Sequence, residues 1–182
     1  MGVTTSTNSA VTYEVINTYT FDGTQSSVTF NNISQAYTDL VVVSQWKQAP
    51  GNTANYALRI NGSSDYTKYY TVWLDGAGGA ASGGSQPGNN SSYNFMRLTS
   101  YGYVSSTWGT YITQFNSYSN TNVNKSVMHR GGNSNNNVGT NLVAGLYTST
   151  AAITSLTFFA QGGAGGNMAS GSTTTVYGIK AA

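Results

Sequence analysis

Charged side chains are scarce in this sequence. Only 12 of its 182 residues are Lys, Arg, Asp or Glu, which is 7%, whereas an ordinary soluble domain has about 25%. The net charge is +2, and the basic residues stand singly along the chain. Nucleic-acid binding generally needs a basic patch that neutralises phosphates, so we expect no nucleic-acid partner. The scarcity of acids and bases also argues against an enzyme.

Other absences narrow the range of functions further. The chain has no cysteine, which excludes disulfides and thiolate metal ligands. It has one histidine, so a zinc site built from several His or Cys ligands is excluded as well. No stretch approaches the roughly 20 apolar residues of a membrane span. We therefore expect no metal, no cofactor and no membrane partner.

Small polar residues and aromatic residues make up much of what is present. Ser, Thr, Asn and Gly account for 90 of the 182 residues, and 23 residues are aromatic, 14 of them Tyr. Disordered chains are poor in aromatic and β-branched residues, so this composition predicts a folded domain. Its surface should consist mainly of hydroxyl, amide and tyrosine groups.

Apolar residues recur with a period of two along most of the chain. Tyr56, Leu58 and Ile60 alternate with smaller or polar residues, and so do Tyr70, Val72 and Leu74. Such alternation indicates half-buried β-strands. Further strands are predicted at 14–21, 38–46, 93–99, 124–130, 141–148, 153–160 and 172–179. The dipeptides Asp22-Gly23, Asn61-Gly62, Asp75-Gly76 and Gly131-Gly132 predict turns.

About ten short strands in a chain of this length predict an all-β fold. We expect a single antiparallel β-sandwich of jelly-roll type over residues 14–182, preceded by a flexible N-terminal arm at residues 1–13. The run Leu40–Val43 is entirely apolar and predicts a central strand. Two Gly-rich segments, 76–90 and 161–171, are expected to be loops, the first of them mobile.

The few groups capable of acid–base chemistry form no recognisable catalytic motif. His129 lies in a predicted strand, no Gly-x-Ser-x-Gly elbow accompanies it, and we expect it at the surface or in an interface. The five carboxylates could in principle form the pair that glycosidases use. Their positions before glycines or beside strands instead predict turns and strand borders. They are Glu14, Asp22, Asp39, Asp65 and Asp75.

The aromatic residues leave three uses open: filling the core, contacting a protein partner, or stacking on sugars. Tyr and Trp are enriched at protein interfaces. The interface residues that we predict are Tyr13, Tyr69, Tyr70, Trp73, Tyr101, Tyr103 and Trp108.

Several ordered segments resemble structural proteins of tailed bacteriophages, including cyanophages. Residues 28–43 (VTFNNISQAYTDLVVV) resemble a short strand followed by a Tyr-Thr-Asp-Leu entry into an apolar strand, with Ser34-Gln35 where a proline is often found. Residues 56–66 resemble the hairpin of these proteins, and residues 151–158 and 171–179 resemble their closing strands. The resemblance implies a jelly-roll virion module, located on the capsid surface or on a tail fibre.

Composition and resemblance together lead to a functional hypothesis. We expect a non-enzymatic capsid decoration, or cement, protein that forms a homotrimer on the virion and bridges neighbouring major capsid proteins. The chain's 182 residues form one predicted domain with no long shaft, which favours this role. The alternative is a tail-fibre or receptor-binding module that recognises glycans on the host surface.

Overall fold

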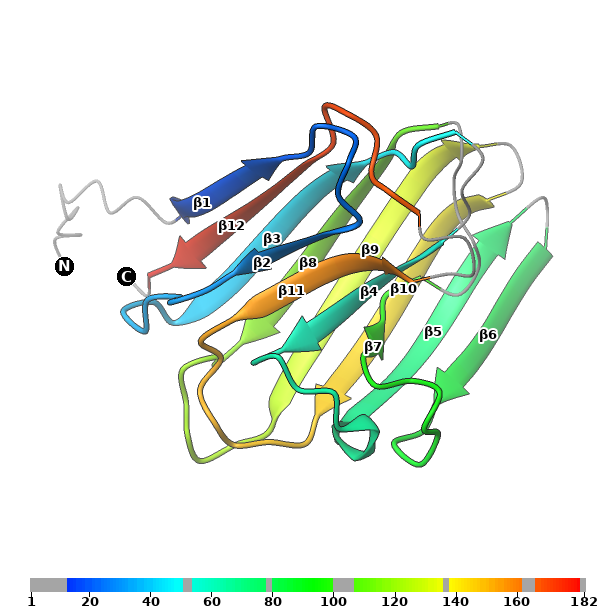
Figure 1. The fold of residues 1–182 in the computed structure, drawn as a ribbon. Helices are drawn as coiled ribbons and strands as arrows, with labels where there is room; N and C mark the ends of the chain where they lie inside the picture. Colours follow the sequence, from blue (N-terminus) through cyan, green and yellow to red (C-terminus); the bar gives the residue numbers. More distant parts are fainter. Residues whose placement is uncertain are drawn as a thin grey trace, which may run out of the picture.

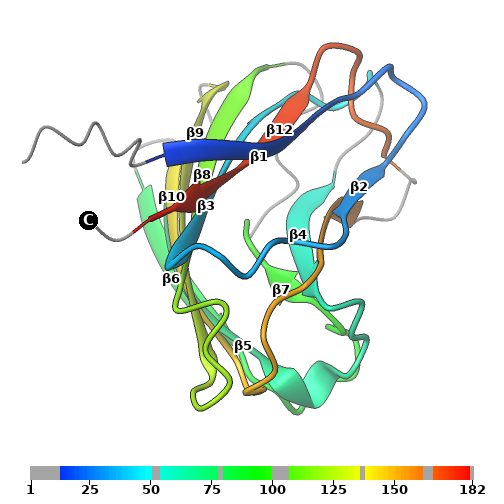
Figure 2. The ribbon, with the colours of Figure 1, turned by 90° about the vertical axis from the view of Figure 1, so that its left-hand side faces the viewer.

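The fold was analysed in a computed structural model that describes residues 13–50, 54–77, 80–99, 107–135, 138–161 and 166–180. Two antiparallel sheets pack face to face as a β-sandwich (Figures 1 and 2). This arrangement confirms the predicted all-β antiparallel sandwich. The predicted arm at residues 1–13 lies outside the described residues, except for Tyr13, with which β1 begins.

The larger sheet has eight strands and the smaller has four. In spatial order, the large sheet consists of β1 (Tyr13–Thr20), β12 (Thr173–Ile179), β3 (Asp39–Trp46), β8 (Gly109–Asn116), β9 (Lys125–Asn135), β10 (Val138–Tyr147), β5 (Tyr69–Ala77) and β6 (Ala80–Gln86). The small sheet consists of β2 (Ser27–Phe30), β11 (Leu156–Gln161), β4 (Asn55–Ile60) and β7 (Met96–Arg97). A 3-10 helix, η1 (Tyr66–Lys68), precedes β5.

Eight of the strands pair in a nested way along the chain. The first pairs with the last (β1 with β12), and β2, β3 and β4 pair with β11, β8 and β7 in turn. The β5–β6 hairpin lies between β4 and β7 in the chain and the β9–β10 hairpin between β8 and β11, and both extend the large sheet beyond β8. The large sheet therefore has twice as many strands as the small sheet that packs on it.

The core between the sheets is apolar and rich in rings. Tyr56 on β4 stands at its centre, with ring centroids 3.7 Å from Trp46, 5.4 Å from Tyr111 and 5.6 Å from Phe158. Its hydroxyl lies 2.8 Å from Ser44 Oγ, which satisfies the polar end of a fully enclosed ring. Burial raises the pKa of Tyr56 well above the ordinary value.

Most strand patterns agree with the predictions. Tyr56, Leu58 and Ile60 are buried, as are Leu40, Val41 and Val42 in the central strand β3. Asn61-Gly62 forms the predicted turn after β4, with both residues at positive φ. Asp22-Gly23 is a turn as well, with Gly23 at a φ of 103°. The predicted strand at 93–99 is reduced to the two residues of β7.

The predicted mobile loop at 76–90 is wrong, because most of it forms regular structure. Residues 80–86 are strand β6, which pairs with β5 from Thr71–Gln86 to Ala77–Ala80. The indole of Trp73 lies directly over Gly84, where an added Cβ would sit 2.5 Å from Cζ2. Gly84 and Gly88 make room for the aromatic rings of Trp73 and Tyr70 on the neighbouring strand.

The turns predicted at Asp75-Gly76 and Gly131-Gly132 are wrong for a related reason. Both dipeptides lie inside strands, β5 and β9 respectively. A Cβ on Gly131 would sit 2.2 Å from the ring of Tyr111. The glycine permits close packing of an aromatic ring on the inner face of the sheet.

Replacing Gly84 by valine is expected to destabilise the protein by about 1–3 kcal/mol, because the new side chain must displace Trp73. Thermal or denaturant unfolding measures the change. Ala81→Val is the matched control, since Ala81 is exposed on the same strand. Equal stability of Gly84→Val and the native chain would contradict the packing of Trp73 on β6.

Candidate interaction surface

The outer face of the large sheet carries exposed apolar side chains. Along β5, Tyr70, Val72 and Leu74 point away from the small sheet and are 41%, 58% and 62% exposed. On the opposite side of the strand, Thr71 and Asp75 are buried and Trp73 is half-buried. Figure 2 shows the small sheet covering one side of the large sheet, while the described chain leaves the other side uncovered.

Strand register joins these side chains to those of β10 and β9. Leu142 lies opposite Leu74, and Leu146 lies opposite Tyr70. Between them Ala144 lies opposite both Val72 on β5 and Met128 on β9. We call this set the apolar face; its members are Tyr70, Val72, Leu74, Met128, Leu142, Ala144 and Leu146, all of them exposed.

The apolar face is nearly free of charge. Among the described residues at outward positions of β5, β8, β9 and β10, Arg130 is the one charged side chain, next to Leu142 in register. Half-buried Ile112 lies on the other side of Arg130 and continues the apolar row toward Val43 on β3. Contiguous exposed apolar surface of this kind marks an interaction site in soluble proteins.

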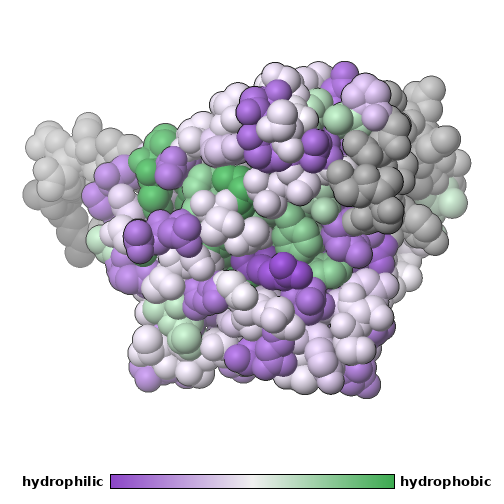
Figure 3. Space-filling view, viewed as in Figure 1, coloured by the Kyte–Doolittle hydropathy of each residue, from purple (hydrophilic) through white to green (hydrophobic). Residues whose placement is uncertain are grey.

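The opposite side of the sandwich has a different chemistry. In Figure 3 the small-sheet side is mostly hydrophilic or neutral, with only scattered hydrophobic residues. The large ring on this side, Phe159, lies 4.9 Å from the Arg59 guanidinium. Arg59 is held in turn by a 2.8 Å hydrogen bond to Asn94 Oδ1. Most of the exposed large hydrophobic side chains among the described residues therefore lie on the large sheet.

An open hollow of about 370 Å³ lies within the apolar face. Tyr70, Val72, Pro87, Ala144 and Leu146 lie among its lining residues, and most of the lining is apolar. The hollow opens between the end of β6 and strands β5 and β10. A partner's apolar side chain could insert here, which is how binding energy concentrates in protein interfaces.

The predicted interface residues are distributed over several parts of the molecule. Tyr70 belongs to the apolar face, and Tyr13 is 52% exposed on β1 at the far edge of the same sheet. Trp108 is 41% exposed and lies 5.9 Å from Lys47 Nζ, away from the apolar face. Trp73 packs on Gly84. Tyr101 and Tyr103 lie outside the described residues.

Tyr69 is a correction to the prediction, because it is fully buried. Its hydroxyl donates to the carbonyl of Ser63 at 2.8 Å and accepts from the backbone N–H of Ile60 at 3.2 Å. Burial raises the pKa of Tyr69 to about 12. Tyr69 therefore fills the core and is not available to a partner.

The alternation of β5 is evident in the sequence, but the outward orientation of its Val-Leu side is not. A strand with Val72 and Leu74 on one side, and Thr71 and Asp75 on the other, favours burial of the Val-Leu side. The structure places that side outward. In β10 both sides carry apolar residues, with Leu142 and Leu146 exposed and Val143 and Tyr147 buried, so its pattern does not indicate the orientation either.

His129 is also a correction, since it lies in the core instead of at the surface. It is 1% exposed, its Nδ1 lies 2.9 Å from Thr113 Oγ1, and its ring stacks on Tyr111 at 5.7 Å. Nε2 has no hydrogen-bond partner. Burial lowers the pKa of His129 to about 3, so the imidazole is neutral in the folded protein at neutral pH.

Four of the five carboxylates have local structural partners. Asp22 accepts from the Thr24 backbone N–H at 2.8 Å, and Asp65 accepts from that of Thr67 at 3.1 Å. Asp39 accepts from the Ser117 backbone N–H at 2.7 Å, and Glu14 pairs with Lys180 at 2.7 Å. Their geometry matches the expected use in turns and strand borders.

Asp75 is the exception, because it is 4% exposed and neither carboxylate oxygen has a hydrogen-bond partner. Burial raises its pKa, against an opposing effect of Arg97. An acid with a raised folded-state pKa favours folding at low pH and loses that contribution as pH rises through the folded pKa. Asp75 therefore weakens the fold at neutral pH.

Replacing Asp75 by asparagine is expected to raise stability at pH 7 by about 1 kcal/mol, or roughly 2–4 °C in Tm. The advantage over the native chain should shrink at pH 3, where the native carboxyl is protonated. Thermal unfolding at both pH values measures it. A larger advantage at pH 3 than at pH 7 would contradict the raised pKa.

Lys125 is another buried ionisable group with a structural role. Its Nζ donates to the carbonyl oxygens of Asn120, Val123 and Thr150, the last two at 2.8 and 3.1 Å. Burial lowers its pKa. These hydrogen bonds link the loop between β8 and β9 to the segment after β10.

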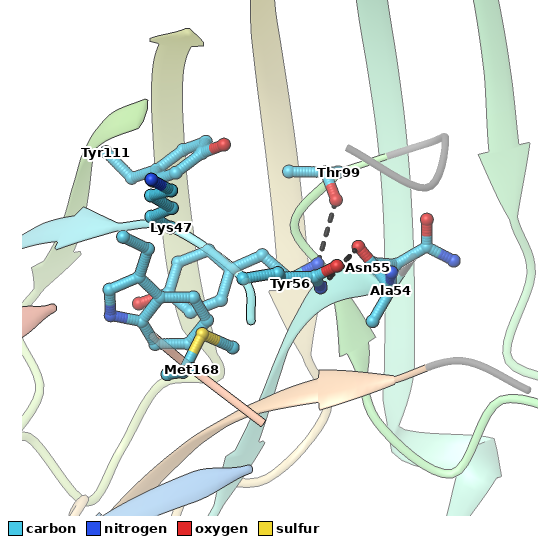
Figure 4. A pocket seen from close by; sticks show the side chains of 9 residues that line it. Lys47, Ala54, Asn55, Tyr56, Thr99, Tyr111 and Met168 are labelled. Atoms are coloured by element: carbon cyan, nitrogen blue, oxygen red, sulfur yellow. Dashed lines mark hydrogen bonds between the residues drawn. The ribbon is translucent and has the colours of Figure 1, made fainter. Parts of the chain in front are cut away.

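A small hollow between β3 and β4 is too small for a ligand. It is lined by residues that include Lys47, Tyr56, Thr99 and Met168 (Figure 4), and its volume is about 20 Å³. The Tyr56 backbone N–H donates to Thr99 Oγ1 across it at 2.9 Å. This space suits about one water molecule.

The described residues contain neither a cluster of potential metal ligands nor a membrane-spanning helix. Within these ranges no group of three or more His, Asp or Glu side chains could hold a metal ion. No helix in the described part of the chain is long and apolar enough to cross a membrane.

Comparison with known proteins found no relative. No family model matches the chain, no curated protein matches it, and no solved structure matches it.

Proposed function

We propose that this protein is a non-enzymatic structural protein that docks on another protein through its apolar face. In the form that the sequence resemblance implies, it is a capsid decoration protein of a tailed bacteriophage, and the partner is the major capsid protein. The observation that carries the proposal is the exposed, nearly uncharged apolar face of β5, β9 and β10. The partner is therefore expected to present an apolar protein surface with few charges.

The energetics favour assembly through this face. Val72, Leu74 and Leu142 are 58%, 62% and 44% exposed, so docking would remove much apolar area from water at about 25 cal/mol per Å². Stable assembly interfaces have apolar cores depleted of charge. Binding of this kind adds contacts that exist only in the assembled shell, and so stabilises the shell by mass action.

We infer further that the sandwich is a jelly roll with two added hairpins. The nested pairs β1–β12, β2–β11, β3–β8 and β4–β7 give eight strands in two sheets, as in a double-sheet jelly roll. The added hairpins β5–β6 and β9–β10 carry all members of the apolar face. Supporting the family resemblance, residues 27–30 form β2, and the Asp39 entry begins β3.

Adding purified protein back to expanded capsids that lack it tests the function. The protein should cosediment with the capsids and raise the temperature at which they disrupt. Binding should change little between low and high salt, because apolar contacts are not screened. Capsids that neither bind the protein nor gain stability would overturn the proposal, as would binding to host glycans by a tail-located protein.

A further inference from the structure

Strand β6 is an unprotected sheet edge. It ends the large sheet beyond β5 (Figure 1), so one side of its backbone has no strand partner among the described residues. Ala80, Ala81, Ser82, Gly83 and Ser85 are all exposed. A free edge presents unpaired N–H and C=O groups that can pair with another strand.

The other three edges carry features that discourage pairing. The β1 edge has a charged residue, Glu14, and a register irregularity between Val15 and Asn17. The two edges of the small sheet are short, with four residues in β2 and two in β7. Charge, bulges and short length are the means by which proteins protect edges.

None of these features occurs on β6. Its seven residues, Ala-Ala-Ser-Gly-Gly-Ser-Gln, include no charge and no proline, and its register with β5 is unbroken. We propose that β6 is a self-association site, at which the β6 strands of two copies pair antiparallel and make one continuous sheet.

The composition of β6 favours a second copy of the chain as the partner at this edge. The small side chains of Ala81, Ser82 and Gly83 allow close approach, and a strand without charge does not repel its own copy. A twofold axis perpendicular to the sheet places one β6 residue opposite its own counterpart and keeps both sandwiches on the same side. The apolar faces of the two copies then join across β6 into one surface, since β5 is the next strand.

The absence of cysteine from the chain permits a clean test by single-cysteine scanning. Cysteine is introduced singly at positions 80, 81, 82 and 85, and disulfide-linked dimer is quantified after mild oxidation. Opposed residues of an antiparallel pair have Cα atoms about 4.5–5.5 Å apart, which a disulfide can bridge. We expect strong cross-linking at one or two of these positions and none for Ser27→Cys on the β2 edge.

Analytical ultracentrifugation of the native chain in the absence of capsids completes the test. It should show a concentration-dependent dimer. Ser82→Lys and Ser85→Lys should each weaken the dimer at least about tenfold, because like charges then face each other across the pair. Ser27→Lys is the charge-matched control and should dimerise as the native chain does.

Two outcomes would overturn the inference. One is a chain that stays monomeric at all concentrations. The other is an oligomer, including a trimer, that forms without cross-links on β6 and is indifferent to the lysines. Neither outcome depends on capsid binding, so failure here is distinguishable from failure of the proposed function.

Discussion

Replacing both Val72 and Leu74 by lysine is expected to weaken capsid binding by at least about a hundredfold. The two side chains stand at the centre of the apolar face, and an ammonium buried there must lose its hydration without gaining a partner. Folding should be unaffected, because both positions are more than half exposed. Cosedimentation with expanded capsids over a range of protein concentrations measures the loss.

A double variant on the opposite side of the sandwich is the control for added charge. Ser27→Lys with Thr29→Lys places the same two charges on exposed positions of β2. This variant should bind as tightly as the native chain. Equal losses in the two variants would mean that charge alone disrupts binding, and unchanged binding of the Val72 and Leu74 variant would remove the apolar face from the interface.

Acidification from pH 6.5 to pH 5 is expected to cost the fold about 2 kcal/mol through His129 alone. Its pKa falls from 6.5 to about 3 on burial, so below pH 6.5 the unfolded chain binds a proton that the folded chain does not. Stability is therefore complete above pH 6.5 and is lost at up to about 1.4 kcal/mol per pH unit as pH falls toward 3. Chemical denaturation at several pH values measures the slope.

Because His129 is the single histidine of the chain, its contribution to the pH dependence of stability can be measured separately. His129→Gln removes the titrating group, so its stability should be nearly flat between pH 6.5 and 5, whatever its absolute value. If the variant folds poorly, proton NMR of the native chain gives a second measure. The one imidazole resonance should show no titration down to about pH 4 while the protein stays folded. A midpoint near 6.5 would contradict burial of His129.

The strands of the core could be predicted from the sequence because their signal is local. In β4, Tyr56, Leu58 and Ile60 alternate along the strand and face the other sheet. The orientation of β5 could not be predicted in this way. Pairing places Trp73 opposite Val143 and Leu74 opposite Leu142, and this register turns the Val-Leu side outward. A single strand's pattern does not contain that information.

The predictions of a loop and of turns at glycine residues were wrong for a similar reason. Gly-rich sequence favours turns and loops when only local conformation is considered. Gly84 and Gly131 instead lie under the rings of Trp73 and Tyr111, which come from neighbouring strands. The contact is between residues 11 and 20 positions apart in the chain. The Asn61-Gly62 turn, whose conformation is local, was predicted correctly.

The candidate surface was predicted only in part. Tyr70 was among the predicted interface residues and lies on the apolar face, whereas Tyr69, one position earlier, is buried. Adjacent residues on a strand point to opposite sides, so the two could not both have been exposed on one face. The aliphatic members of the face, such as Leu74 and Leu142, are of a residue type that is usually buried, so their type alone does not indicate a surface position.

A reconstruction of the virion that contains this protein tests the central claim most directly. The account predicts that the chain lies on the head, with Val72, Leu74 and Leu142 in contact with the major capsid protein and the small sheet facing solvent. A chain located on the tail, or one on the head whose apolar face is open to solvent, would contradict it.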